Sequence, residues 1–408
     1  MFTENDKSIV RELAREYLSL FYKHDHEEMT KRFRDTNDRK LVRPPLLINE
    51  IPWHQMNIDD ELTCICENDT ARGIEADLRR RIFYLKHFKG ADHTYSPYLK
   101  LVKAFDATDI GVVRKVDDVR RADAKNHIAS SHFEDVFEDE SALEKMHDPI
   151  FTPRPDLDEK RMEAYLELVG DSIPVKLCGI PFVAFVPWDD LAFLRGVEPI
   201  FMDMYDRPEY LHAIMEKLCS AANARIAFIE KYVGFDRDHP DLHCTPSAIS
   251  GLESQGLKSV WFRGTAQALG SVSPQMFDEF EVEYIKPIAE RFAYTYYGCC
   301  EPLDDRIEKI KRIGNLRKIG CSPWANVERC AEQIGGDFVL SRKPNPANVA
   351  VATDPEVIRR EIEETAKACI KYGCPCDIVL KDISTVSYRP ENLILWAETA
   401  SRVLDEYY

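Results

Sequence analysis

From about residue 160 onward, short apolar stretches alternate with longer amphipathic ones, and this alternation limits how the chain can fold. Repeated strand–helix units with nearly continuous apolar strands predict a parallel sheet, because parallel strands are buried on both faces. Counting from residues 46–48, about eight strands are expected. They include residues 98–105, 110–113, 173–178, 242–244, 294–297, 316–320, 337–340 and 378–380. This number favours an α/β fold closed as a (β/α)8 TIM barrel over an open, doubly wound sheet.

The composition fits one large globular unit, with 44% hydrophobic and 31% charged residues among 408. Length alone would suggest two or three domains, but α/β barrels routinely exceed that limit. We therefore expect residues 1–408 to form a single domain. Residues 1–40 are predicted to be an N-terminal helical extension, and the region 90–150, much of it highly charged, is predicted to be an insertion.

The net charge of −17 argues against nucleic acid or an anionic membrane as a partner. No apolar run approaches the ~18 residues of a membrane span, and the first residues lack the basic and apolar regions of a signal peptide. The expected location is therefore cytoplasmic. In that location the 12 cysteines are expected to be reduced thiols.

The segment 293–303, Ala-Tyr-Thr-Tyr-Tyr-Gly-Cys-Cys-Glu-Pro-Leu, holds the strongest candidate site. Its aromatic and β-branched residues favour a strand that Gly298 ends. Cys299, Cys300 and Glu301 would then follow the carboxyl end of a strand, where ligands bind in α/β folds. Two thiols and a carboxylate suit zinc. The alternative is a pair of buried structural cysteines, which are common.

Other strand ends offer further candidates. His243 and Cys244 end a predicted strand and could add metal ligands, although a histidine there is as often a structural hydrogen bonder. Lys381 and Asp382 follow the last predicted strand, and Asp382 could equally cap the closing helix. Arg342 could bind a substrate anion or a partner's acidic face, or lie in a solvated loop.

Several segments, in this order and spacing, resemble the uroporphyrinogen decarboxylase superfamily, whose fold is a single (β/α)8 barrel. They include Leu-Cys-Gly-Ile-Pro-Phe at 177–182, Tyr-Gly-Cys-Cys-Glu-Pro at 297–302, Ser-Pro-Trp-Ala-Asn-Val at 322–327, Arg-Lys-Pro-Asn-Pro at 342–346 and Arg-Pro-Glu-Asn-Leu at 389–393. The resemblance covers residues 160–408 well and the N-terminal third loosely.

The resemblance implies one of two chemistries. The decarboxylase branch pairs substrate carboxylates with an arginine-containing segment after the first strand, but here that region has Glu50 instead. This disfavours a porphyrinogen substrate. The other branch contains zinc-dependent corrinoid methyltransferases, including the methyltransferase I components of anaerobic aryl-ether O-demethylases.

In the coenzyme M enzymes of that branch, zinc is held by a His-x-Cys pair and a cysteine on the last strand. The corresponding positions here are Tyr297-Gly298-Cys299 and the neighbourhood of Lys381–Asp382, so the histidine and the last cysteine are missing. The resemblance therefore implies a mixed zinc site. Its expected ligands are Cys299 or Cys300, Glu301, Asp382, and His243 or Cys244.

The resulting hypothesis is methyl transfer between a small methylated substrate, with a methoxylated aromatic favoured, and the cobalt of a corrinoid protein. Asp382, Lys381 or Tyr297 would supply a proton to the leaving group. The expected substrate contacts are Trp53, Phe182, Trp188, Trp324 and Arg342, although any of the aromatic residues could be core. The alternatives are a metal-free decarboxylase or lyase of a small carboxylic acid, and a non-catalytic corrinoid- or small-molecule-binding protein.

Overall fold

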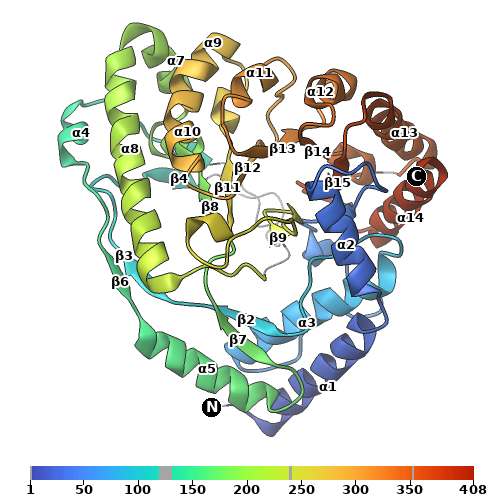
Figure 1. Cartoon of the computed structure of the whole chain (residues 1–408). Helices are drawn as coiled ribbons and strands as arrows, with labels where there is room; N and C mark the ends of the chain where they lie inside the picture. The colour runs from blue at the N-terminus through green and yellow to red at the C-terminus, as the bar shows by residue number, and fades with distance from the viewer. Residues whose placement is uncertain (1, 119–130, 239–240, 352) are drawn as a thin grey trace.

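The computed structural model describes residues 2–118, 131–238, 241–351 and 353–408. Its largest sheet has seven parallel strands and curls into an arc (Figure 1). Sequence pattern placed five of the seven correctly, four of them on short runs of mainly apolar or aromatic residues; the fifth, at 316–321, contains Arg317 and Lys318. In sheet order the strands are β1 (Leu46–Ile48), β15 (Cys376–Leu380), β14 (Val339–Arg342), β13 (Leu316–Cys321), β12 (Tyr294–Tyr297), β11 (Trp261–Gly264) and β8 (Phe182–Phe185).

The expected eight-stranded closed barrel is only partly realised. Within the described residues, β1 and β8 are the edges of the seven-stranded sheet, and no hydrogen-bonded ladder joins them. The strands expected within 98–105 and at 173–178 pair instead with each other, as β2 (Leu99–Val102) and β7 (Val175–Cys178). They lie across from the arc in Figure 1. The observed architecture is thus an α/β, barrel-like half-ring.

The sequence prediction missed β8 and β11. The residues before β8 read Gly-Ile-Pro and were expected to form a turn with Phe182, whereas Phe182 begins the strand. Strand β11 reads Trp-Phe-Arg-Gly, and its arginine and glycine interrupt the apolar pattern. The strand expected at 110–113 is absent from the described chain, whose residues 110–113 contain only loop and bend.

The predicted N-terminal helical extension consists of two helices, α1 (Glu4–Phe21) and α2 (His26–Asn37). Thr3 begins α1 with a reciprocal capping box that also uses Asp6. Helix α1 packs against α3 (Asp69–His87) and α5 (Pro155–Val169). The apolar residues of these helices form a core of their own, separate from the main sheet.

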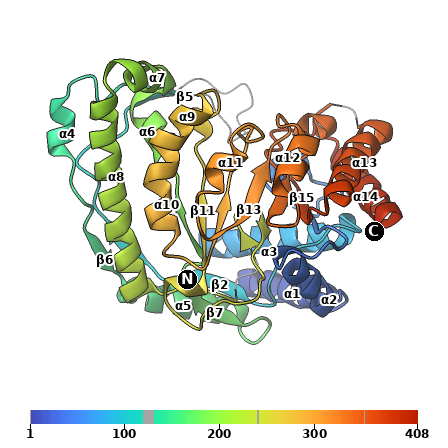
Figure 2. The ribbon, with the colours of Figure 1, turned by 45° about the horizontal axis from the view of Figure 1, so that its top comes forward.

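Helices cover the outer side of the arc (Figure 2). Their apolar faces and the strands form two large cores, one around β8 to β14 and the other around β1 and β15. The covering helices are α6 (Pro187–Arg195), α7 (Val197–Asp206), α8 (Pro208–Phe228), α9 (Pro274–Phe277), α10 (Glu283–Ala289), α11 (Ile307–Ile310), α12 (Val327–Ile334), α13 (Pro355–Tyr372) and α14 (Pro390–Tyr407).

The predicted insertion at 90–150 holds β2 and several small elements. These are β3 (Phe105–Ala107) paired with β6 (Phe151–Pro153), β4 (Val116–Asp118) paired with β5 (Ser131–Phe133), and α4 (Ser141–Lys145). Part of the highly charged stretch expected there lies outside the described residues. No helix among the described residues has both the length and the apolar character needed to cross a bilayer.

A short hairpin, β9 (Asp241–Leu242) and β10 (Thr245–Pro246), lies within the arc (Figure 1). The sequence prediction counted residues 242–244 as the end of a barrel strand, which is wrong, because they form an antiparallel turn outside the parallel sheet. Leu242 packs with Phe182, Trp261 and Tyr294, the first residues of β8, β11 and β12. The hairpin therefore enters from the amino ends of the strands, and His243 and Cys244 form its tip.

Candidate functional site

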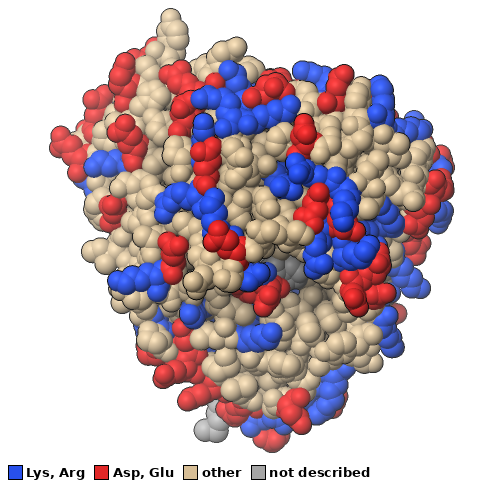
Figure 3. Space-filling view, viewed as in Figure 1, with Lys and Arg blue, Asp and Glu red and all other residues tan. Residues whose placement is uncertain are grey.

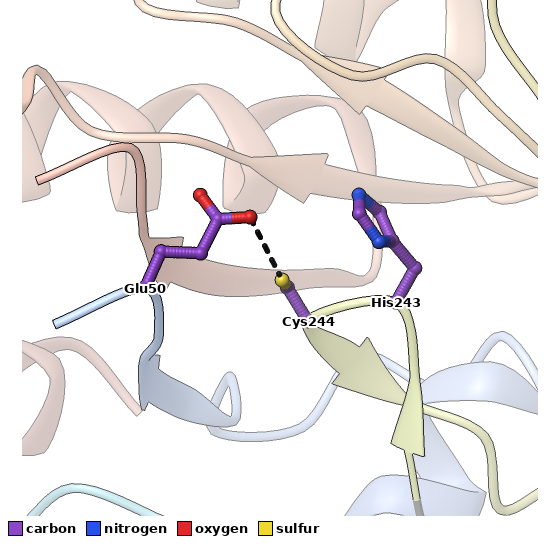
Figure 4. Close-up of side chains that lie close together, drawn as sticks. All are labelled: Glu50, His243 and Cys244. Carbon is purple, nitrogen blue, oxygen red and sulfur yellow. Dashed lines mark hydrogen bonds between the residues drawn. The ribbon is translucent and has the colours of Figure 1, made fainter. Parts of the chain in front are cut away.

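The tip of the hairpin meets the end of β1 at a group of three potential metal ligands. The ligand atoms of Glu50, His243 and Cys244 all lie within 4.8 Å of one another. Glu50 follows β1 by two residues, and its carboxylate faces the Cys244 sulfur, 3.7 Å away (Figure 4). One oxygen, one nitrogen and one sulfur donor thus converge from segments almost 200 residues apart in the chain.

Backbone strain accompanies this convergence. Glu50, His243, Cys244 and Asp382 all have positive φ, at 52°, 42°, 69° and 58°. Non-glycine residues seldom adopt this region, and such conformations gather at functional sites because the surrounding structure must enforce them. Side-chain hydrogen bonds help here, since Asn49 donates to the Cys244 carbonyl (2.9 Å) and Glu50 accepts from the Asp382 amide (2.9 Å).

The predicted thiol pair lies beside this group. Cys299 Sγ is 3.9 Å from His243 Nε2 and 3.5 Å from Cys300 Sγ. Cys300 Sγ also lies 2.9 Å from Asp382 Oδ2, so its one thiol proton faces two acceptors, Cys299 and Asp382. The structure therefore brings together five of the expected site residues, Cys299, Cys300, His243, Cys244 and Asp382.

Lys381 is the cation at the centre of this site. Its side chain is 2% exposed, and its Nζ atom lies 3.3 Å from Cys299 Sγ, 3.4 Å from Asp382 Oδ2 and 3.6 Å from Glu50 Oε1. Burial opposes its charge, but the neighbouring thiols and carboxylates outweigh burial and raise the pKa of Lys381. Lys381 is therefore a permanent positive charge among acidic groups.

The pKa values of the two neighbouring thiols shift in opposite directions. The hydrogen bond from Cys300, reinforced by His243 and the Lys381 ammonium, lowers the pKa of Cys299 strongly. The same hydrogen bond and burial raise the pKa of Cys300. Cys299 is accordingly the more acidic thiol of the pair. Burial and the Glu50 charge raise the pKa of Cys244 when no ion is bound.

Glu301, expected to be a ligand, is oriented differently. Its buried carboxylate accepts hydrogen bonds from Thr265 Oγ1 (2.6 Å) and from the Cys299 amide (3.0 Å). Burial raises the pKa of Glu301 to about 7. This geometry makes Glu301 a support for the Cys299 backbone rather than a member of the ligand group.

Three of the other expected residues lie in the core. Tyr297 is fully buried and donates its hydroxyl proton to Glu281, and Trp188 is fully buried with its indole N–H on the Phe280 carbonyl. The Arg342 guanidinium is buried and donates to the Ser322 carbonyl and to Glu361. These contacts engage the polar groups of the three side chains within the core.

The remaining expected aromatic residues are dispersed. Trp324 is 70% exposed on the loop after β13, and Phe182 packs at the amino end of β8. Only Trp53 adjoins the site. It lines a cavity of about 470 Å³ that also reaches Glu50. This volume lies in the range of small-molecule pockets.

A buried polar network holds the hairpin in place. Lys318 and Asp377, both with 0% exposed side chains, form an ion pair of 2.6 Å, and Thr245 Oγ1 donates to the same carboxylate oxygen at 2.7 Å. Lys318 also donates to the Pro246 carbonyl. Because Thr245 and Pro246 directly follow Cys244, this network sets the position of the tip.

The sequence prediction missed Glu50 as a potential metal ligand, although its place after the first apolar strand was visible. The available signal was a carboxylate at a strand end. Such a position does not indicate a metal ligand until a second donor is known to face it. The facing donors come from the hairpin, and no periodicity in the sequence indicates that hairpin.

Comparison with known proteins shows a similarity in fold. No family model and no curated protein matches this sequence. Among solved structures, the chain is similar to a methyltransferase from Methanosarcina mazei, with a TM-score of 0.50 and 12% sequence identity, over 93% of this chain and 99% of that one. At this identity the likeness shows that the two chains share their overall fold.

Proposed function

We propose that this protein is a zinc-assisted methyltransferase that moves a methyl group between a small methylated substrate and the cobalt of a corrinoid held by a partner protein. The observation that supports it best is the group formed by Glu50, His243 and Cys244 beside a cavity. The fold shared with a methyltransferase is consistent with this proposal.

The donor set suits zinc. Zinc binds thiolate, imidazole and carboxylate at about 2.0–2.3 Å, so the ligands of a tetrahedral ion lie ~3.5 Å apart. The three donor atoms, all within 4.8 Å of one another, need only small movements to reach that spacing. Three protein ligands with a fourth position left open are typical of catalytic zinc. Cys299, next to His243, is available as a replacement or fourth ligand.

When bound, zinc would act as a Lewis acid on the substrate heteroatom that loses the methyl group. The chain's own residues then have two tasks. Glu50 and the hairpin tip hold the ligand geometry. In this proposal Lys381, whose ammonium lies 3.4 Å from Asp382, would place positive charge beside the departing oxygen, nitrogen or sulfur, and one of these two residues would supply its proton.

Metal content and methyl transfer test the proposal together. The purified full-length protein is analysed for zinc and assayed for methyl transfer from methoxylated aromatics to reduced cobalamin. We expect about one zinc per chain, and loss of both zinc and transfer in Glu50→Gln, His243→Ala and Cys244→Ala. Cys219→Ala and Glu308→Gln, which change the same residue types outside the site, serve as controls.

The alternatives predict other results. A metal-free protein that releases carbon dioxide from a small carboxylic acid, insensitive to chelators, would replace the proposal with a decarboxylase. Corrinoid binding without transfer of any methyl group tested would indicate a binding protein.

A further inference from the structure

The cavity next to Glu50 has a strongly asymmetric lining. Its walls include the apolar side chains of Ile51, Trp53, Leu62 and Ile383. His54, Cys64 and Ser384 also line it, and Arg80 is the single lysine or arginine in its lining among the described residues. Glu50 belongs to both the cavity and the ligand group. The cavity therefore combines one positive charge and an aromatic wall with a carboxylate that belongs to the proposed ligand group.

Arg80 differs from its neighbours on helix α3 in having no carboxylate partner. Arg79 pairs with Glu75 and Arg81 with Asp77, each one helical turn earlier at 2.8 Å. The corresponding position for Arg80 is Ala76, which itself lines the cavity. Across the described residues, no carboxylate lies within ion-pairing distance of Arg80. Its guanidinium carbon lies over the Trp53 ring, 5.9 Å from the ring centroid.

From this geometry we infer that the cavity binds an aromatic substrate that carries an anionic group, with the anion on Arg80 and the ring against Trp53. A guanidinium is the side chain best suited to hold a carboxylate or sulfonate, through two parallel hydrogen bonds. The Glu50 charge repels the anion, so it fixes one orientation. The methylated end then points to the ligand group and the anionic end away from it.

The acidity of the whole chain strengthens the argument. With a net charge of −17, the molecule repels anions in general, and charged residues of both signs surround the hollow seen in Figure 3. Arg80, whose exposed side chain lines the cavity without a carboxylate partner, offsets that repulsion at one place. The inference rests on the proposed function for the methylated end of the ligand, but the recognition of the anionic end can be tested separately.

Binding of two matched probes to the full-length protein tests it. 4-Methoxybenzoate and the neutral 4-methoxybenzamide have nearly the same shape and differ in charge. Isothermal titration calorimetry should show at least a tenfold tighter binding of the benzoate to the natural protein. Arg80→Gln should abolish this preference, and Arg80→Lys should retain part of it. Trp53→Ala should weaken both probes and leave their ratio unchanged.

Lys89→Gln is the matched control, because Lys89 is exposed just beyond the same helix and does not line the cavity. It removes the same charge and should keep the full preference. Equal affinities for the two probes in the natural protein, or a preference that survives in Arg80→Gln, would overturn the inference.

The outcome is separable from that of the proposed function. If binding of the benzoate is preferred through Arg80 but no methyl is transferred, the anion site would stand and the proposed methyltransferase function would be rejected. If methyl is transferred from the neutral and the charged probe at the same rate, and this rate is unchanged in Arg80→Gln, the methyltransferase function would stand and the anion site would be rejected.

Discussion

The ammonium group of Lys381 lies 3.3 Å from the sulfur of Cys299, and the two residues come from different strands of the curled sheet. Each residue directly or closely follows its strand, Lys381 after β15 and Cys299 after β12. The contact links the thiol pair to Glu50 and Asp382, because Lys381 also approaches both carboxylates. The Lys381 ammonium thus lies close to both the thiols and the carboxylates, so its charge acts on both.

Replacing Lys381 by glutamine should raise the pKa of Cys299. The hydrogen bond from Cys300 is the largest cause of the lowered value, and the Lys381 charge adds to it. In metal-depleted protein, the ultraviolet absorbance of the thiolate should therefore appear at higher pH in Lys381→Gln than in the natural protein. Cys299→Ser identifies the signal. An unchanged titration would show that the ammonium does not act on Cys299.

Breaking the buried pair of Lys318 and Asp377 should destabilise the fold and loosen the hairpin. Removing one member of a fully buried pair leaves the other charge uncompensated, at a cost of about 3–5 kcal/mol. Lys318→Met should lower the free energy of urea-induced unfolding by this amount and should also weaken zinc binding. In the exposed pair Lys311–Glu308, with side chains 27% and 71% exposed, Glu308→Gln should cost less than about 1 kcal/mol.

Stability should fall with rising pH because of Glu301. Burial raises the pKa of Glu301 from 4.5 to about 7, so the folded chain holds its proton while the unfolded chain releases it. The stability contribution is complete below about pH 4.5 and is lost as the pH rises through about 7. Between pH 5 and 8 the natural protein should lose roughly 2–3 kcal/mol more unfolding free energy than Glu301→Gln does. Equal slopes in both proteins would contradict this assignment.

Gly298→Ala should disturb the thiol pair. Gly298 has φ of +108°, and a Cβ atom there would lie 2.6 Å from Leu303 Cδ1 and 3.2 Å from the Gly320 nitrogen. Strain of this kind costs about 1–3 kcal/mol, and relief requires moving the chain that leads into Cys299. We expect a lower unfolding free energy and slower methyl transfer. Gly73→Ala, in helix α3 with nothing within 4 Å of the added atom, should slightly stabilise the protein instead.

Much of the secondary structure follows from local pattern. The core of five sheet strands and the N-terminal helical extension were predicted because apolar spacing is a property of adjacent positions. Strands β8 and β11 were missed because a proline, an arginine and a glycine disrupt the pattern locally. Their neighbours in the sheet supply the stabilisation that the local sequence does not indicate.

The sequence alone placed Cys299, Cys300, Lys381 and Asp382 at the carboxyl ends of strands, since each follows an apolar run directly. Only the tertiary structure decided which donors face one another. Glu50 meets Cys244 because β1 adjoins β15 at one edge of the sheet and an internal hairpin carries residues 243 and 244 to that edge. Contacts between segments almost 200 residues apart depend on sheet order and curvature, and neither is encoded in the spacing of neighbouring residues.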